Sequence, residues 1–320
     1  MKKLLISISL LISLNSFSQI SPNEKVDSFQ YEQSFIIYLD SVVVSAVNQG
    51  FVIEDFIELI QNDETFYRAF KNLRYSDYDF SNDITFFTKK NKTSGKLQSV
   101  NHQYFNDNCR WMDVSSTSEN YGIYDKKGNS EYFTMDMYEK QFFTEGLICD
   151  IDTAVDINFK STGGSKIENY STELKKLIFS PGSDIDIPLI GNKMEIFSPE
   201  MQKYYDYSFY HSYYNGEIPS YVFSVNLKKS LKQSQQNKTV IKYLNTYFQS
   251  DNLQVLAREY HLKYKFPGMD FDVVINIKLD KKNNIYYPTT IYYSGNWNVL
   301  FKKREISTFK TNIYNFKYKL

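Results

Sequence analysis

Ten residues near the C-terminus, FDVVINIKLD at 271–280, decide the fold class. Apolar and polar side chains alternate along this stretch with a period of two, which is the pattern of a β-strand with one buried and one solvated face. The side chains on the apolar face are Phe271, Val273, Ile275, Ile277 and Leu279. The stretch therefore predicts a sheet that packs a core against one side.

Further strands are predicted on both sides of this stretch, joined by turn sequences. Asn215-Gly216 lies between two apolar runs and is typical of a tight hairpin. The polar stretch 281–284 follows the strand at 271–280, and Ser294-Gly295-Asn296 predicts another turn before a short strand at 297–301. Hairpins in succession predict an antiparallel meander.

The N-terminal part carries apolar side chains at helical spacing instead. The ranges with this spacing are 31–47, 53–60 and 63–74, and Ser165-Lys166-Ile167-Glu168 has the capping-box form at the start of a further helix. Strands are predicted at 84–89, 97–105 and 110–116. We therefore expect a helical segment at 19–75, followed by an antiparallel β domain at 76–320 with an inserted helix near 165–179.

The first 18 residues have the layout of a secretory signal peptide. Lys2 and Lys3 precede an apolar run from Leu4 to Leu14, and Ser16 and Ser18 are the small residues that a signal peptidase requires. We expect cleavage after Ser18. We then expect the mature protein in the periplasm or at the outer-membrane periphery, with an extracellular location as the alternative.

The charge balance and the cysteine content limit the classes of protein that fit this sequence. Removing Lys2 and Lys3 from 37 basic residues leaves 35 against 37 acidic ones, a net charge of −2. This balance argues against a nucleic-acid partner, which calls for a strongly basic face. Cys109 and Cys149 are the only cysteines, and they fit either one disulfide or two buried thiols.

Catalytic motifs are absent in their recognisable forms. The chain has no G-x-S-x-G, H-E-x-x-H or C-x-x-C sequence and no Walker-type loop. Its histidines, His102, His211 and His261, lie far apart in predicted strands. We expect a protein that is not an enzyme and that needs no cofactor or metal.

Lys302, Lys303 and Arg304 form a basic cluster beside two aromatic residues, Trp297 and Phe301. Such a cluster is suited to docking on anionic lipid or on a partner protein. Its structural alternative is a solvated loop, or an edge protected by lysine against aggregation.

Five stretches spread over most of the chain carry a resemblance to a known group. They are Phe66-Tyr67-x-Ala69-Phe70-x-Asn72-Leu73, Cys109-Arg110, Phe179-x-Pro181-Gly182-Ser183, Met201-x-Lys203-Tyr204-Tyr205-Asp206-Tyr207 and Phe301-Lys302-Lys303-Arg304-Glu305. On these stretches the chain resembles a group of exported bacterial envelope proteins, a likeness that brings no activity with it.

In the order of its predicted strands, mainly over 193–320, the chain is also similar to periplasmic lipoprotein carriers of the LolA/LolB type. In that family a curved, unclosed sheet holds an apolar concave face, helices cover it, and acyl chains bind between. The resemblance implies an α+β, mainly β fold: a large curved antiparallel sheet, or open half-barrel, with helices packed on its concave face. No functional residue carries over from the family.

Two functions from different classes are consistent with the sequence. The first is an envelope protein that binds or carries a lipid or a lipoprotein acyl chain in a groove lined by Phe271, Val273, Ile275 and Ile277; plain core packing is the alternative for each of these side chains. The second is a non-catalytic structural component that docks on an outer-membrane protein.

Overall fold

The computed structural model describes residues 53–116, 120–149, 181, 191–266, 269–299 and 303–318. By contact density the chain divides into residues 1–35 and residues 36–320, and all described residues belong to the second unit. The predicted signal peptide, the helix at 31–47 and the inserted helix near 165–179 lie outside the described residues.

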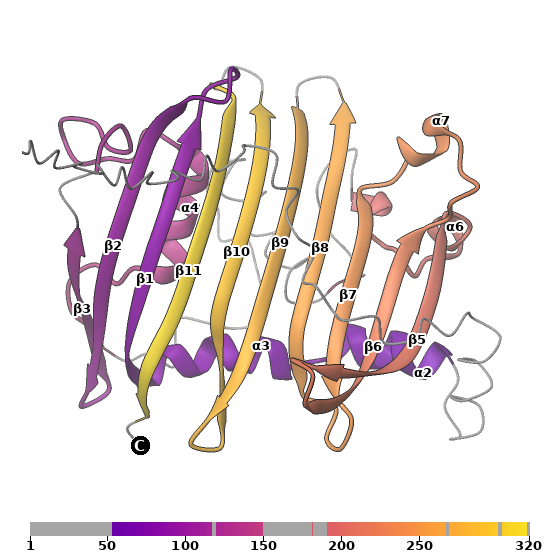
Figure 1. Ribbon diagram of the computed structural model, residues 1–320, viewed down its shortest axis with the longest axis horizontal. Helices are drawn as coiled ribbons and strands as arrows, with labels where there is room; N and C mark the ends of the chain where they lie inside the picture. The colour runs from indigo at the N-terminus through magenta and orange to yellow at the C-terminus, as the bar shows by residue number, and fades with distance from the viewer. Residues whose placement is uncertain are drawn as a thin grey trace, which may run out of the picture. The chain divides into compact units, whose positions relative to one another are not determined.

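A single antiparallel sheet of eleven strands dominates the described part of the chain, so the mainly β fold is confirmed. Its strands lie side by side in the order β4-β3-β2-β1-β11-β10-β9-β8-β7-β6-β5, and the sheet is not closed (Figure 1). The bounds are β1 Ser76–Phe87, β2 Thr93–Asn106, β3 Cys109–Ser116, β4 Ile148–Cys149, β5 Tyr205–Tyr214, β6 Ile218–Leu227, β7 Ile241–Gln249, β8 Val255–Phe266, β9 Met269–Lys282, β10 Ile285–Val299 and β11 Glu305–Tyr318.

The strands from β5 to β11 form the predicted meander, each paired with the next along the chain. The strand pattern of the sequence does not decide whether residues 76–190 complete the same sheet or form a sheet of their own. The structure answers this, because β1 pairs with the last strand, β11, placing Ile84 opposite Phe309. The strands β1 to β4 therefore extend one sheet rather than building a second one.

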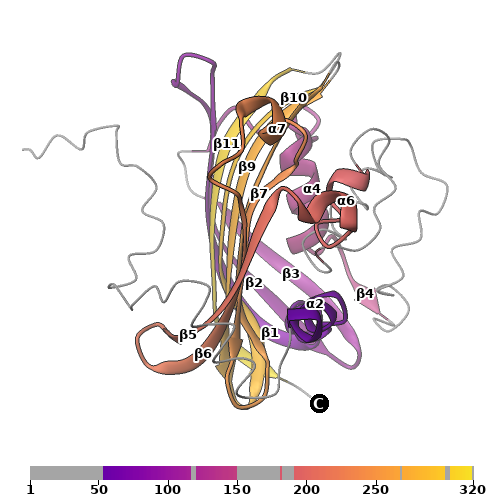
Figure 2. The same ribbon diagram turned by 90° about the vertical axis from the view of Figure 1, so that its right-hand side faces the viewer.

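Helices account for little of the described chain. They are α2 Ile53–Gln61, α3 Thr65–Asn72, α4 Phe133–Phe142, α6 Pro199–Gln202 and α7 Gln233–Gln236, with short 3₁₀ turns at Leu73–Tyr75 and Gly191–Lys193. Figure 2 shows α2, α4 and α6 on the same side of the sheet. We call this side the inner face.

Turn residues explain why the hairpins close where they do. Asn215 and Gly216 have φ of 52° and 76°, and Asn283 and Asn284 have φ of 48° and 69°. Two consecutive residues with positive φ match the right-handed twist of the flanking strands. The Asn215-Gly216 hairpin and the turn within 281–284 are therefore confirmed.

The predicted turn at Ser294-Gly295-Asn296 is wrong, and so is the separate strand at 297–301. The strand β10 runs without a break from Ile285 to Val299. Gly295 is in the strand for a steric reason: a Cβ on it would lie 1.9 Å from the hydroxyl oxygen of Tyr293, whose side chain lies over it. The glycine makes room for an aromatic ring and does not mark a bend.

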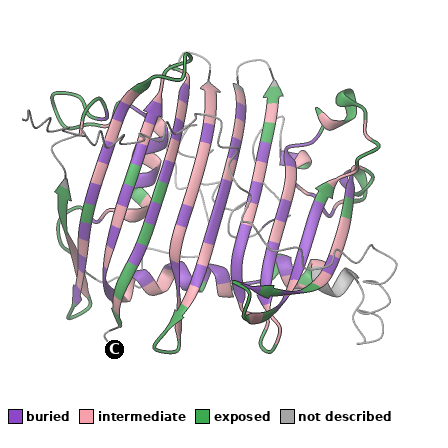
Figure 3. Cartoon of the chain, in the orientation of Figure 1, coloured by how far each residue is buried: buried purple, intermediate pink, exposed green. Residues whose placement is uncertain are grey.

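Burial alternates along the strands, as the pattern at 271–280 predicts (Figure 3). In β9 every second side chain from Phe271 to Leu279 is buried. These side chains belong to the larger apolar cluster, which also holds Ile60, Phe66 and Phe70 from α2 and α3. The apolar face of the sheet is thus the face on which the helices pack.

Candidate functional site

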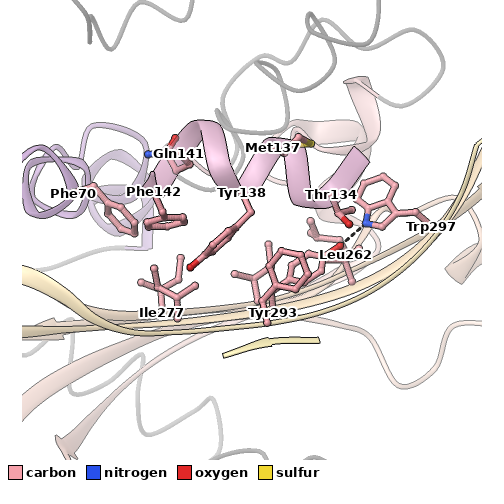
Figure 4. A pocket seen from close by; sticks show the side chains of 14 residues that line it. Phe70, Thr134, Met137, Tyr138, Gln141, Phe142, Leu262, Ile277, Tyr293 and Trp297 are labelled. Carbon is pink, nitrogen blue, oxygen red and sulfur yellow. Dashed lines mark hydrogen bonds between the residues drawn. The ribbon is translucent and has the colours of Figure 1, made fainter. Parts of the chain in front are cut away.

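An apolar cavity of about 180 Å³ lies between α4 and the inner face of strands β8 to β11 (Figure 4). Its floor is formed by the sheet, its roof by α4, and one end by Phe70 of α3. The floor residues are Leu262, Val273, Ile275, Ile277, Ile291, Tyr293, Trp297 and Phe309.

The floor is continuous because of the strand register. Ile275 pairs with Tyr293 and Ile277 pairs with Ile291 across β9 and β10. Directly paired residues point to the same face of a sheet, so these side chains form one apolar surface. Three of the four groove residues proposed from the sequence, Val273, Ile275 and Ile277, line the cavity. The fourth, Phe271, does not, and instead stacks on Trp297 with ring centroids 4.9 Å apart.

The roof of the cavity comes from α4, a helix that was not predicted from the sequence. Its lining residues, at the spacing i, i+3, i+4, i+7, i+8, are Thr134, Met137, Tyr138, Gln141 and Phe142. This spacing is the stripe of an amphipathic helix, and it was the one signal in the sequence that could have revealed the roof. The apolar residues around the rest of the helix, such as Phe133 and Met135, obscure that stripe.

Glu305 of β11 fixes the start of α4 to the sheet. Its carboxylate accepts hydrogen bonds from the backbone N–H of Phe133 at 2.7 Å and of Thr134 at 3.0 Å. The hydroxyl of Thr134 donates to the same carboxylate at 2.8 Å. The helix has no capping side chain of its own at Tyr132, so this distant glutamate supplies the cap.

The hydroxyl and indole groups around the cavity are hydrogen-bonded within the protein. The hydroxyl of Tyr138 donates to Asn82 Oδ1 at 2.5 Å and lies 2.6 Å from Thr311 Oγ1. The indole N–H of Trp297 donates to the hydroxyl oxygen of Tyr293 at 2.6 Å. Burial raises the pKa of both Tyr138 and Tyr293, which keeps the two phenols neutral. The cavity therefore presents an uncharged, mainly hydrocarbon surface.

The basic residues singled out in the sequence are engaged with the protein, as far as they are described. Lys302 lies outside the described residues. The ammonium of Lys303 lies 5.3 Å from the ring centre of Tyr132. The guanidinium of Arg304 forms an ion pair of 3.0 Å with Asp270. Neither residue lines the apolar cavity.

The two cysteines are joined in a disulfide between β3 and β4. Cys109 and Cys149 are directly paired in the antiparallel register. Because β4 has only two residues, the disulfide secures the edge of the sheet away from the cavity.

Two histidines pair with carboxylates, but they lie away from the cavity. His102 Nδ1 bonds to Asp79 Oδ1, and His261 Nε2 lies 2.8 Å from Asp272 Oδ1. Both histidines occupy strand positions that alternate with the buried inner-face residues, so they lie on the outer face. Among the residues that the structure describes, no group of His, Cys, Asp and Glu side chains is arranged to hold a metal ion.

No described helix has the length and apolar composition that crossing a lipid bilayer requires. No protein-family profile and no curated protein sequence matches the chain. A crystal structure of a domain assigned to outer membrane lipoprotein sorting, from Vibrio parahaemolyticus, aligns with 82% of this chain and 92% of that domain, at 9% identity and a TM-score of 0.27. An alignment this loose carries no argument about function, so the family resemblance stays a prediction.

Proposed function

We propose that this protein binds a hydrophobic ligand, a lipid or the acyl chain of a lipoprotein, in the cavity between α4 and the sheet. In this proposal the sheet is an open half-barrel of the LolA/LolB kind, its concave face carries the helices, and α4 is part of the lid. The carrier acts in the cell envelope, where the predicted signal peptide would deliver it.

The observation that carries the proposal is a cavity lined almost entirely by apolar atoms, in which the polar groups of Thr134, Tyr138 and Trp297 are already hydrogen-bonded within the protein. Such a cavity is a poor site for water, and an apolar cavity of roughly 150 Å³ in another protein stays dry and accepts a benzene-sized guest. The volume of about 180 Å³ found here suits a short length of hydrocarbon chain. Each methylene transferred from water contributes about 0.8 kcal/mol, so binding needs no charged or catalytic group.

The experiment is uptake of a fluorescent fatty-acid probe by delipidated protein, with two matched variants. Val273→Phe fills the cavity from its floor, whereas Val274→Phe places the same ring on the outer face of the same strand. If the added ring displaces about two methylene groups of the ligand, the affinity falls roughly tenfold in Val273→Phe. Val274→Phe keeps the affinity of the unmodified protein.

Two outcomes contradict the proposal. The first is the absence of saturable uptake by the unmodified, folded protein. The second is equal uptake by the two variants, which would place the probe somewhere other than this cavity.

A further inference from the structure

Two arginines, Arg74 and Arg110, belong to neighbouring segments at the end of the sheet where β3 begins. Arg74 is in the 3₁₀ turn that follows α3, and Arg110 is the second residue of β3. Figure 1 shows the end of α3 and the start of β3 at the same end of the sheet. Arg110 pairs directly with Phe105 of β2, so the two side chains point to the same face. That face carries the turn, because the ring centroids of Phe105 and Tyr75 are 5.9 Å apart.

The turn that contains Arg74 is fixed to the sheet by a buried glutamine. The side-chain amide of Gln103, in β2, donates to the carbonyl oxygen of Leu73 at 2.7 Å and to that of Ser76 at 3.2 Å. The side chain of Gln103 is fully buried. The backbone on both sides of Arg74 is therefore held against the strand that pairs with β3.

The two guanidinium groups are close enough to repel each other. Burial lowers the pKa of Arg74, and the charge of Arg110 lowers it further. Both groups also act on one phenol: burial raises the pKa of Tyr78, and the positive charges of Arg110 and Arg74 oppose that shift. Two like charges therefore converge on one partly buried region.

No acid compensates these charges within the part of the chain that the structure describes. Neither Arg74 nor Arg110 forms an ion pair there, and Nε of Arg110 is buried without a hydrogen-bond partner. The other arginines in the described ranges all have carboxylate partners, which are Glu64 for Arg68, Asp63 for Arg258 and Asp270 for Arg304.

An uncompensated pair of this kind suits an anionic ligand. Charges removed from water lose hydration, and a buried donor without an acceptor adds to that cost. A phosphate monoester carries a charge of about −1.5 to −2 at neutral pH, which matches two guanidinium groups. Its oxygens accept the paired N–H groups of an arginine in a bidentate arrangement. A carboxylate offers the same geometry but only one negative charge.

We propose that Arg74 and Arg110 form a binding site for a phosphate monoester. Both residues remain partly exposed, so a ligand can reach them from solution. Neither residue lines the apolar cavity, and the site does not depend on the uptake of lipid there. The phosphate belongs to a small soluble ester or to the headgroup of a lipid, and the experiment separates these two sources.

The experiment is a calorimetric titration of the purified protein, with its disulfide intact, at constant ionic strength. The probes are glycerol 3-phosphate, with glycerol as its uncharged control, and phosphatidic acid in phosphatidylcholine vesicles, with vesicles of phosphatidylcholine alone. We expect saturable binding of a phosphate-bearing probe and none of its control. Arg74→Gln/Arg110→Gln should weaken that binding at least about 100-fold, since each charged donor contributes about tenfold or more. Arg110→Lys keeps the charge but loses the bidentate geometry, so it should weaken binding about tenfold.

The matched control is Arg68→Gln/Lys127→Gln, which removes the same charge from two exposed side chains and should leave the affinity unchanged. Binding of glycerol 3-phosphate supports the site and identifies a soluble ester as sufficient. Binding of phosphatidic acid vesicles alone supports the site and identifies a lipid headgroup. The proposal is overturned if the folded, unmodified protein binds neither probe, or if both double variants lose affinity equally. If Arg74→Gln/Arg110→Gln does not fold, an unchanged affinity in Arg110→Lys overturns the proposal, and a tenfold loss supports it.

Discussion

The helices α3 and α4 both rest on the inner face of the sheet, but they are fastened to it by opposite arrangements of charge. At α3 the carboxylate belongs to the helix side: Asp63 accepts from the N–H of Thr65 and forms a 2.7 Å ion pair with Arg258 of β8. At α4 the carboxylate belongs to the sheet, because Glu305 of β11 receives the N–H groups of the helix. Among the described residues no cation forms a salt bridge with Glu305.

This difference distinguishes α3, which is part of the core, from α4, which covers the cavity. The side chains of Asp63 and Arg258 are 2% and 0% exposed, and the guanidinium also lies 4.5 Å from the ring centre of Phe66. By contrast Met137 and Phe142 of α4 are only partly buried, above a cavity. We therefore expect α3 to unfold only with the whole domain, and α4 to open locally.

The largest expected effect is the loss of the α3 anchor. Arg258→Met leaves the buried Asp63 carboxylate without a cation, which should lower the free energy of unfolding by about 3–5 kcal/mol. Adding Asp63→Asn keeps a capping side chain and removes the orphaned charge. Denaturant unfolding should show the double variant to be more stable than Arg258→Met alone. A double variant that is less stable would mean that Asp63 has no dependence on Arg258.

A smaller and local effect is expected at α4. Glu305→Ala removes the cap from the first turn of the helix and should cost about 1–2 kcal/mol. Hydrogen exchange should become faster at residues 133–142 and stay unchanged at 65–72. Glu305→Gln retains an acceptor oxygen, so its stability should lie between that of the unmodified protein and that of Glu305→Ala. Faster exchange in both helices would contradict the proposed independence of α4.

The hydroxyl of Tyr138 tests how α4 is held at its middle. Tyr138→Phe removes the hydrogen bond to Asn82 but leaves the 3.0 Å bond between Thr311 and Asn82. Thermal unfolding should therefore show a loss of about 1 kcal/mol. Because the ring still covers the cavity, uptake of the fatty-acid probe should not change. A large loss of uptake would show that the hydroxyl positions the ligand.

The smallest effect is expected at Asp272, a half-exposed carboxylate on the outer face. The hydrogen bond from His261, together with Lys263, lowers the pKa of Asp272 from 3.8 to about 2. A depressed pKa gives stability that is present above the unfolded value and is lost as the pH falls from about 4 to about 2. Asp272→Asn should flatten the stability profile in that window, by less than either helix anchor contributes because solvent screens the pair.

Particular residues show how far the sequence could predict this structure. The alternation at 271–280 and the Asn215-Gly216 turn depend on contacts between near neighbours, and both predictions are confirmed. The prediction of a turn at 294–296 was wrong because Gly295 makes room for the side chain of Tyr293, and the neighbouring residues in the sequence do not reveal this contact. At the cavity, the period of two identified Val273, Ile275 and Ile277, but it could not show that Phe271 would stack on Trp297.

The sequence by itself determined a succession of half-apolar strands and the positions of several turns, because strand period and turn geometry act over a few residues. Only the tertiary structure decided that β1 joins β11, that Glu305 caps a helix 172 residues earlier in the chain, and that a cavity remains below that helix. These contacts join segments far apart in sequence, and their energies depend on packing and burial that exist only after the sheet has assembled.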